Sequence, residues 1–275
     1  MRFDIVTIFP SFFAGIFENG ILRRALAEEL VSVPVHDLRA FTHDRHRTVD
    51  DRPFGGGEGM VLKAEPLAEA LASLGVKPKA EEESGEIAAA ATRVILLSAQ
   101  GRRFTQATAR ELAKLDRVVL ICGRYEGVDE RINQLYCDME LSIGDYVLSG
   151  GELAAAVVID ATMRLIPGVL GNEASGEFES FGVADADITS DTKGVPRSQH
   201  GAGGLLDYPH YTRPAEFGGL RAPDVLMNGD HLQIRRWRRE QQLRKTLANR
   251  PDLLEDAALS AEDRRLLDAI RRDVR

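Results

Sequence analysis

The sequence predicts an α/β fold, a parallel sheet covered by helices on both faces, followed by a small helical C-terminal domain. Short segments that are wholly apolar, such as 118–122, alternate with segments of helical periodicity as far as about residue 165. Strands that are buried on both faces of a parallel sheet have this composition. From about Gly229 onward, apolar residues recur at helical spacing among many charges, which predicts the helical domain.

The elements are expected in a regular order along the chain. The first half predicts a strand at 3–9 that ends at Pro10, a helix at 11–30, a short strand at 31–37, a polar and glycine-rich loop at 41–60 and a short helix at 66–74. After a surface excursion at 77–91 come a strand at 94–97 that breaks at SAQG, a helix at 105–115, a strand at 118–122, a helix at 129–135, a strand at 139–143 and a helix at 153–165. Thr105 or Thr108 is expected to cap its helix, because a threonine hydroxyl accepts hydrogen bonds from the free N–H groups of a first turn.

We expect three parts in the chain. Residues 1–168 form the α/β domain, which Pro167 and Gly168 close. Residues 169–204 are rich in Gly, Ser, Asp and Glu and poor in large apolar residues, which predicts a flexible linker. Residues 205–275 form the helical C-terminal domain.

The composition excludes several classes of protein. The chain has 275 residues, of which 44% are hydrophobic, enough for one sizeable core and a smaller second unit. No stretch approaches the roughly 20 apolar residues that cross a bilayer, so no membrane association is expected. Asp4 and Pro10 interrupt the apolar N-terminus, which argues against a signal sequence. The two cysteines, Cys122 and Cys137, form no CxxC pair, so we expect neither disulfides nor a zinc site, and the cytoplasm is the expected compartment.

Three apolar strands are each followed by a glycine-marked turn: SAQG at 98–101, GRYEG at 123–127 and IGDYVLSGG at 143–151. Ligands of open α/β sheets bind at the carboxyl ends of the strands, and glycine lets bare backbone groups approach a ligand. Together the turns predict a cleft for a flat, polar ligand such as adenine, although each turn alone is also explained as an ordinary connection between a strand and a helix. The sequence contains no GxGxxG after the first strand, no GxxxxGK[ST] and no GxSxG, so the dinucleotide-binding, P-loop and hydrolase motifs have no support.

Six runs of residues resemble the bacterial tRNA (guanine-N1)-methyltransferase family, which modifies guanine 37 beside the anticodon. They lie in order and are TIFP at 7–10, TVDDRPFGGGEGM at 48–60, CGRYEGVDERI at 122–132, SIGDYVLSGGELA at 142–154, RLIPGVLGN at 164–172 and LLDYPHYTRP at 205–214. Any one run is moderately specific, whereas six together are highly specific. The resemblance implies a SPOUT-type fold with a deep trefoil knot and a homodimer with active sites at the subunit interface.

The resemblance also implies that S-adenosylmethionine is the cofactor, held in the knot. By resemblance, the residues that contact it are Ser98, Gly123, Tyr125, Glu126, Ile143, Gly144, Tyr146, Leu148, Gly150 and Gly151. For Tyr125 and Tyr146, half-buried packing is the alternative explanation. Family members depend on a divalent ion, usually magnesium. Because the sequence shows no metal-binding cluster, we expect Mg²⁺ to act through the tRNA or only transiently at the site.

Two residues are expected to act on the guanine. Arg164 matches the arginine that orients the base and supports the charge developing on it, although a cation at a helix C-terminus also complements the helix dipole. Methylation at N1 requires that the N1 proton leave, and a carboxylate is the simplest acceptor. Glu179 in FESF stands where family members commonly have aspartate, which makes it the expected general base. Asp185 and Asp187 are rivals, and an ordinary linker acid is the other explanation of Glu179.

Contacts with tRNA are expected in three segments. By resemblance, the loop at 48–60 closes on the tRNA and supplies Asp50 and Arg52, although Asp50 and Asp51 are also explained as part of a solvated polar loop. The segment 231–250 has seven basic residues and one acid, a local charge of +6 in a chain of net charge −8, and suits phosphates unless it is simply a solvated helix face. By resemblance, the run at 205–214 lies near the substrate through Asp207, His210 and Arg213. The segment 182–203 looks like an insertion, to which the sequence assigns no purpose.

Two other functions stay open at this point: a SPOUT methyltransferase for another RNA position, or a non-catalytic RNA-binding protein. The runs at 48–60 and 205–214 favour the tRNA enzyme over the first. Arg164 and the glycine turns speak against the second, whereas glutamate at position 179 favours it. We therefore expect methyl transfer from S-adenosylmethionine to N1 of guanine 37 in tRNA, with a carboxylate as general base.

Overall fold

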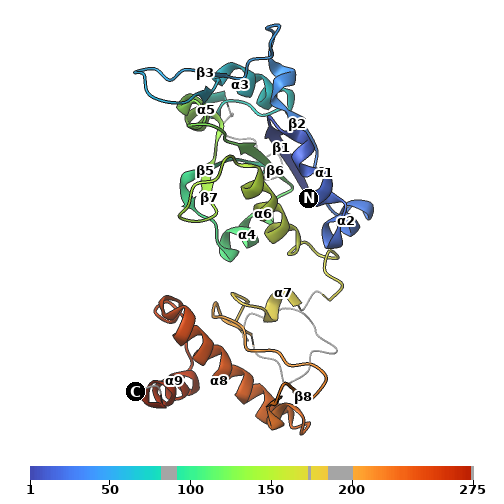
Figure 1. Cartoon of the computed structure of the whole chain (residues 1–275), viewed down its shortest axis with the longest axis vertical. Helices are drawn as coiled ribbons and strands as arrows, with labels where there is room; N and C mark the ends of the chain where they lie inside the picture. Colours follow the sequence, from blue (N-terminus) through green and yellow to red (C-terminus); the bar gives the residue numbers. More distant parts are fainter. Residues whose placement is uncertain (82–91, 173–174, 185–200, 274–275) are drawn as a thin grey trace. The chain divides into compact units, whose positions relative to one another are not determined.

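A computed structural model describes residues 1–81, 92–172, 175–184 and 201–273 (Figure 1). The chain divides into two compact units, Met1–Leu170 and Gly171–Arg275. Asp185 and Asp187, the rivals of Glu179, lie outside the described residues, as does most of the excursion predicted at 77–91.

Five parallel strands form the central sheet of the first unit, in the order β2-β1-β6-β5-β7. These strands are β1 (Arg2–Thr7), β2 (Val35–Asp37), β5 (Thr92–Arg103), β6 (Arg117–Cys122) and β7 (Met139–Ser142). Every pairing in the sheet is parallel. The parallel sheet predicted from the wholly apolar segments is therefore confirmed.

Helices pack on both faces of this sheet (Figure 1). The helices of the first unit are α1 (Ala14–Phe17), α2 (Gly20–Ala27), α3 (Ala64–Ser73), α4 (Gln106–Leu112), α5 (Glu130–Tyr136) and α6 (Glu152–Met163). On β6, Val118 and Leu120 belong to the core shared with α2, α4 and α6. Val119 and Ile121 belong to the core shared with α3 and α5. Because side chains alternate between the faces of a strand, a strand covered on both sides leaves no polar position.

The segment 11–30 is not the single helix that its spacing predicts. A 3₁₀ turn at Pro10–Phe13 leads into α1, and α2 begins only at Gly20. Gly20 has φ +61°, a left-handed conformation that glycine adopts without strain and that interrupts an α-helix. The strand predicted at 31–37 is also shorter than expected, since Pro34 lacks the N–H that would extend the ladder before Val35.

The strand break predicted at SAQG is wrong. β5 continues through 98–101 to Arg103, and its register against β7 shifts between Leu97 and Arg102. A Cβ at Gly101 would collide with the backbone of Glu140 and Leu141, so this glycine permits close strand contact rather than a turn. Irregularities of this kind bend a strand and commonly lie near functional sites.

Two longer helices, α8 (His231–Asn249) and α9 (Ala261–Asp273), dominate the second unit, which also contains α7 (Ser175–Phe178), β8 (Glu216–Phe217) and β9 (Leu220–Arg221). Leu205, Leu243 and Ile270 form its small core. The described residues of 171–204 belong to this unit: the N–H of Phe181 donates to the carbonyl of Leu205 at 2.8 Å. The flexibility expected of 169–204 stays a prediction. Across the described parts of both units, no helix is long and apolar enough to cross a membrane.

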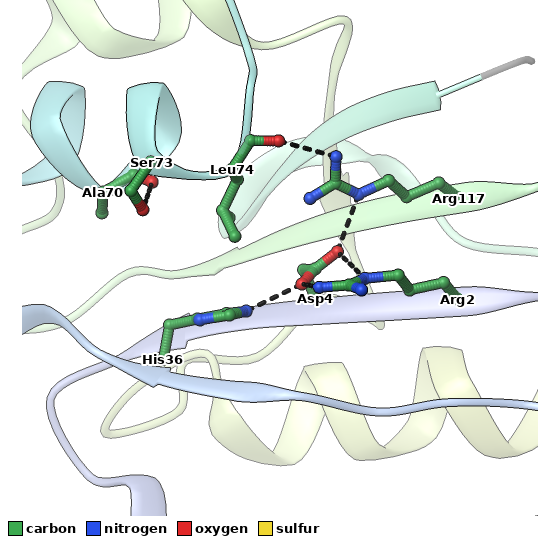
Figure 2. Close-up of polar contacts among 7 residues, drawn as sticks. All are labelled: Arg2, Asp4, His36, Ala70, Ser73, Leu74 and Arg117. Carbon is green, nitrogen blue, oxygen red and sulfur yellow. Dashed lines mark hydrogen bonds and ion pairs between the residues drawn. The ribbon is translucent and has the colours of Figure 1, made fainter. Parts of the chain in front are cut away.

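One carboxylate joins three strands at a corner of the sheet. Asp4 is fully buried, and Figure 2 shows its oxygens facing Arg2, His36 and Arg117. Arg2 donates two hydrogen bonds of 2.8 Å, Arg117 donates one of 2.7 Å, and Nε2 of His36 lies 2.7 Å away. Arg117 also donates to the carbonyl of Leu74, just beyond α3, at 2.7 Å. Asp4 thus ties β1 to β2, β6 and the end of α3.

The hydrogen bonds to Asp4 decide its ionisation. Burial alone would raise the pKa of this carboxyl, but the donors Arg2, His36 and Arg117 outweigh burial and lower its pKa from 3.8 to about 2. A carboxyl whose pKa is lower in the folded state stabilises the fold at pH values above its unfolded pKa. This stabilisation is lost as the pH falls from 3.8 through about 2.

We expect Asp4→Asn to lower the free energy of unfolding by about 3 kcal/mol at pH 7, because it leaves Arg117 and Arg2 facing a neutral group. Urea unfolding should show a constant difference from the wild type above about pH 5 that shrinks between about pH 4 and 2. Asp116→Asn, which changes an exposed carboxylate of the same unit, is the control and should change little. A difference that persists unchanged to pH 2 would contradict this role of Asp4.

Candidate active site

A cavity of about 340 Å³ lies in the first unit, beside the ends of β5, β6 and β7. Its walls come from β5, from the loop after β6 and from the loop between β7 and α6. Small-ligand pockets commonly measure roughly 300–1,000 Å³ and occur at this edge of open α/β sheets. All ten residues matched to the family's cofactor contacts line this one cavity: Ser98, Gly123, Tyr125, Glu126, Ile143, Gly144, Tyr146, Leu148, Gly150 and Gly151.

The glycines of the cavity let its two main loops touch each other. The N–H of Gly151 donates to the carbonyl of Gly123 at 2.8 Å. A Cβ on Gly151 would lie 2.7 Å from the Cα of Cys122, and a Cβ on Gly123 would lie 3.1 Å from the carbonyl oxygen of Leu97. From the sequence we expected these glycines to bring backbone close to a ligand. Here they bring backbone close to backbone, and this contact sets the shape of the cavity.

Both tyrosines matched to the cofactor site lie at the cavity with about half of their surface exposed, 49% for Tyr125 and 55% for Tyr146. Tyr125 has φ +58°, a conformation that few non-glycine residues adopt. The hydroxyl of Tyr146 donates to the carbonyl of Ile143 at 3.3 Å, and its ring lies against Gly144. These positions fit both contact with a ligand and the half-buried packing that the sequence also allows, so the cofactor contacts of both tyrosines stay a prediction.

A buried acid that the sequence did not single out lies at the cavity's edge. Glu152, in the first turn of α6, is 3% exposed. It accepts a hydrogen bond of 2.8 Å from the hydroxyl of Thr7 and lies 3.7 Å from Nη1 of Arg124. The Arg124 guanidinium lies over the ring of Phe9, 4.7 Å from its centre. Thr7, Arg124 and Glu152 each lie in a different one of the runs that match the family, so the sequence contained a signal for them. Their mutual contact becomes visible only in the fold.

The loop expected to close on tRNA ends at the cavity wall. β3 (Asp50–Asp51) pairs with β4 (Val61–Leu62), which makes 52–60 the loop of a hairpin. The N–H of Glu126 donates to the carbonyl of Met60 at 3.0 Å, and a Cβ on Gly59, where φ is +81°, would collide with the Glu126 carboxylate. Of the two residues proposed to contact tRNA, Asp50 is partly buried in β3 and Arg52 is exposed.

Arg164 directly follows α6 and is partly buried in the first unit, whereas Glu179 belongs to the second unit. The turn that holds Glu179 is fixed to the run at 205–214. The hydroxyl of Ser180 accepts from the N–H of Asp207 at 2.9 Å. Nε2 of His210 lies 2.9 Å from the Asp207 carboxylate. The structure thus brings Glu179, Asp207 and His210 into one region, while Arg213 is exposed further along the same run.

Some cations of the basic segment 231–250 are paired with carboxylates, and its contact with tRNA stays a prediction. Arg239 is 7% exposed and donates to both oxygens of Asp263, at 2.7 and 3.0 Å. Burial alone would raise the pKa of Asp263, but its hydrogen bonds with Arg239 and Ser260 outweigh burial and lower the pKa to about 2. Arg239 is therefore part of the packing between α8 and α9 and does not face a phosphate.

Other basic residues of α8 and its end also have acidic partners. Arg244 pairs with Glu240 and with Asp273, and Arg250 pairs with Asp252. The local charge of +6 in segment 231–250 is larger than its free positive charge. Of the four acidic partners of Arg239, Arg244 and Arg250, only Glu240 lies within that segment. Lys245 remains exposed on α8.

Residues able to hold a metal ion do not gather within the described ranges: no group of three or more His, Cys, Asp or Glu side chains is suitably placed there.

Comparison with known proteins identifies the family of the chain. The family described as tRNA (Guanine-1)-methyltransferase TrmD matches residues 1–256. The chain belongs to this family. The resemblance inferred from the six runs is thereby confirmed, and the match to this methyltransferase family covers the whole first unit and most of the second.

Among individual relatives, a protein of Koribacter versatilis named tRNA (guanine-N(1)-)-methyltransferase is 54% identical over 98% of both chains. Proteins with the same name from Geobacter metallireducens and Dictyoglomus turgidum are 48% and 47% identical. These alignments cover 97% and 100% of this chain and 96% and 98% of the relatives, respectively.

We expect Gly151→Ala to weaken S-adenosylmethionine binding about tenfold or more, because the added methyl group forces apart two loops that are in backbone contact, and overpacking of this kind costs about 1–3 kcal/mol. Titration calorimetry with the cofactor measures the change. Gly15→Ala is the matched control, since a Cβ there meets nothing within 4 Å. Unchanged affinity in Gly151→Ala would show that the contact between the loops does not shape the binding site.

Proposed function

We propose that this member of the methyltransferase family transfers the methyl group of S-adenosylmethionine to N1 of guanine 37 in tRNA, in the cytoplasm and as a homodimer. The observation that carries the proposal is the gathering of all ten residues matched to the cofactor contacts in one cavity. Relatives that align over almost the whole chain are named for guanine-N1 methylation of tRNA.

We further propose the SPOUT-type trefoil knot and the dimer that the resemblance implies. The backbone contact between the loops after β6 and β7 supports the knot, since a threaded chain needs residues without side chains where it passes another segment. Leu153 and Val157 support the dimer: they lie one helical turn apart on α6 and are 50% and 45% exposed. A second copy of the chain would cover this apolar face.

The cavity suits the proposed cofactor. Ile143 and Leu148 offer apolar surfaces for the adenine ring, and the backbone groups near them offer donors and acceptors for its edge. The carboxylate of Glu126 lines the same cavity and complements a cationic ligand. When bound, S-adenosylmethionine supplies an electrophilic methyl group on a positively charged sulfur. Mg²⁺ is proposed to act through the tRNA or only transiently at the site.

Two residues of this chain would act on the guanine. Glu179 accepts the N1 proton, which frees the nitrogen lone pair for the methyl group. The turn that carries Glu179 is held by the Ser180–Asp207 hydrogen bond, which supports a fixed position for the carboxylate. Arg164 carries a permanent positive charge and stabilises the negative charge that spreads over the base as the proton leaves.

The test of the function uses labelled S-adenosylmethionine and tRNA transcripts with guanine or adenine at position 37. Label should enter only the guanine transcript, and digestion of the product should yield 1-methylguanosine. Transfer to the adenine transcript would indicate a methyltransferase for another position. Absence of transfer to either transcript, with tRNA still bound, would indicate a non-catalytic RNA-binding protein.

Glu179→Gln is expected to lower the single-turnover methylation rate by about 10²–10⁴-fold, the usual contribution of a general base, without changing cofactor affinity. The amide keeps the size of the side chain but does not accept the proton. Glu255→Gln, an exposed acid of the same unit, serves as control. A near-normal rate in Glu179→Gln would remove Glu179 from the mechanism and leave Asp185 and Asp187 as candidates.

A further inference from the structure

The segments on either side of β3 carry exposed side chains that take no part in the chemistry of the cavity. Arg45 and Arg47 lie in the turn before β3, and Arg52 and Phe54 lie in the loop after β3. We name these four residues the basic–aromatic surface. All four are exposed, and Phe54 is 98% exposed. In Figure 1 the connection between β3 and β4 projects from the body of the first unit.

The turn that carries the first two arginines is well defined. The carboxylate of Asp44 accepts from the backbone N–H groups of His46 and Thr48 at 2.8 and 2.9 Å. Nη1 of Arg39 donates to the carbonyl of Arg47 at 3.2 Å. The backbone is therefore fixed by its own contacts, while the side chains of Arg45 and Arg47 extend into solvent.

The cations of this surface differ from those of α8. In the described part of the chain, Arg45, Arg47 and Arg52 form no ion pair, and Asp44 is occupied by the backbone of its own turn. On and beside α8, by contrast, Arg239, Arg244 and Arg250 are each paired with carboxylates. Guanidinium groups without carboxylate partners are free to bind phosphates in fork geometry, and binding to phosphates releases counterions.

Among the described residues of the first unit, none covers the ring of Phe54, which is 98% exposed. Gly55, Gly56 and Gly57 follow it with φ of +88°, +78° and +121°, and a Cβ on any of them would meet nothing within 4 Å. An aromatic ring on such a loop suits a flat partner, and unpaired RNA bases stack on aromatic side chains in this way. The loop returns to the cavity wall at Gly59 and Met60. Five residues from Phe54 to Gly59 span at most about 18 Å, which keeps the ring within reach of the cavity.

We propose that Phe54 stacks on an unpaired nucleobase of the tRNA close to the target guanine, while Arg45 and Arg47 bind phosphates of the same tRNA. This inference rests on the proposed function, because the substrate is taken to be tRNA. It adds a contact that positions the RNA loop at the cavity and that needs no particular base, since every base has a face on which a ring stacks.

The test compares three variants at position 54 for binding to a tRNA transcript with guanine 37. Phe54→Ala and Phe54→Leu should each raise the Kd about tenfold or more, whereas Phe54→Trp should keep it within about twofold, because stacking requires a ring. Affinity for S-adenosylmethionine and the sedimentation coefficient should remain those of the wild type.

A double variant tests the arginines. Arg45→Ala with Arg47→Ala should reduce the slope of log Kd against log salt concentration by about 1.4, or about 0.7 for each lost phosphate contact to single-stranded RNA. Arg23→Ala with Lys114→Ala removes the same charge from exposed positions of the same unit and should leave the slope unchanged. Equal slopes for the two double variants would exclude a specific phosphate site.

Three results would overturn the stacking contact. Wild-type Kd in Phe54→Ala would show that the ring does not touch RNA, and wild-type Kd in Phe54→Leu would show apolar contact without stacking. A dissociated dimer or a weakened cofactor affinity in Phe54→Ala would place the ring against a second copy of the chain or in the cofactor site. Failure of the proposed function is seen separately, as absence of methyl transfer by the wild-type enzyme.

Discussion

The backbone contact between Gly123 and Gly151 is the constraint on which the cavity depends. A sheet edge offers two separate loops, and a ligand site forms only when those loops are held at a fixed spacing. Here a 2.8 Å hydrogen bond holds them, and it exists because neither residue carries a Cβ. The residue after Gly151 is Glu152, whose buried carboxylate reaches Thr7 at the end of β1 and approaches Arg124 in the neighbouring loop. One short stretch of chain therefore fixes the loops to each other and to the sheet.

Buried charged side chains lie where different strands and helices meet, rather than within the apolar packing between the sheet and its helices. β1 carries two such contacts, Asp4 near its beginning and the Thr7–Glu152 contact at its end. In the second unit, Arg239 and Asp263 join α8 to α9. Buried ion pairs add little net stability over apolar residues of the same size, but losing one partner is costly. We infer that these pairs specify position: each fails sharply when a strand or helix shifts, whereas apolar packing tolerates small shifts.

The sequence predicted what local composition controls and failed where distant segments meet. The wholly apolar strands at 94–97 and 118–122 were correctly located, because burial on both faces leaves a signal in each residue. The continuation of β5 through SAQG was missed, since the reason for Gly101 is the backbone of Glu140 and Leu141, about forty positions later. Likewise, the local charge of segment 231–250 includes Arg239 as a free cation, because its partner Asp263 lies on another helix. The gathering of the ten matched residues required the family resemblance, as no spacing in the sequence brings 98, 125 and 146 together.

The pairing of arginines changes how an acidic chain attracts RNA. A net charge of −8 predicts repulsion from phosphates, and the sequence of the segment 231–250 offers a local positive charge that would offset this repulsion. In a paired guanidinium, however, the N–H donors are already bound to a carboxylate, so the arginine contributes little to phosphate binding. What counts is the number of cations without such partners and their position relative to the reacting base. Of the basic–aromatic surface, Arg52 lies on the loop that ends at the cavity wall, next to Glu126. A few residues of one hairpin thus connect the cavity to a cation that can attract the RNA backbone.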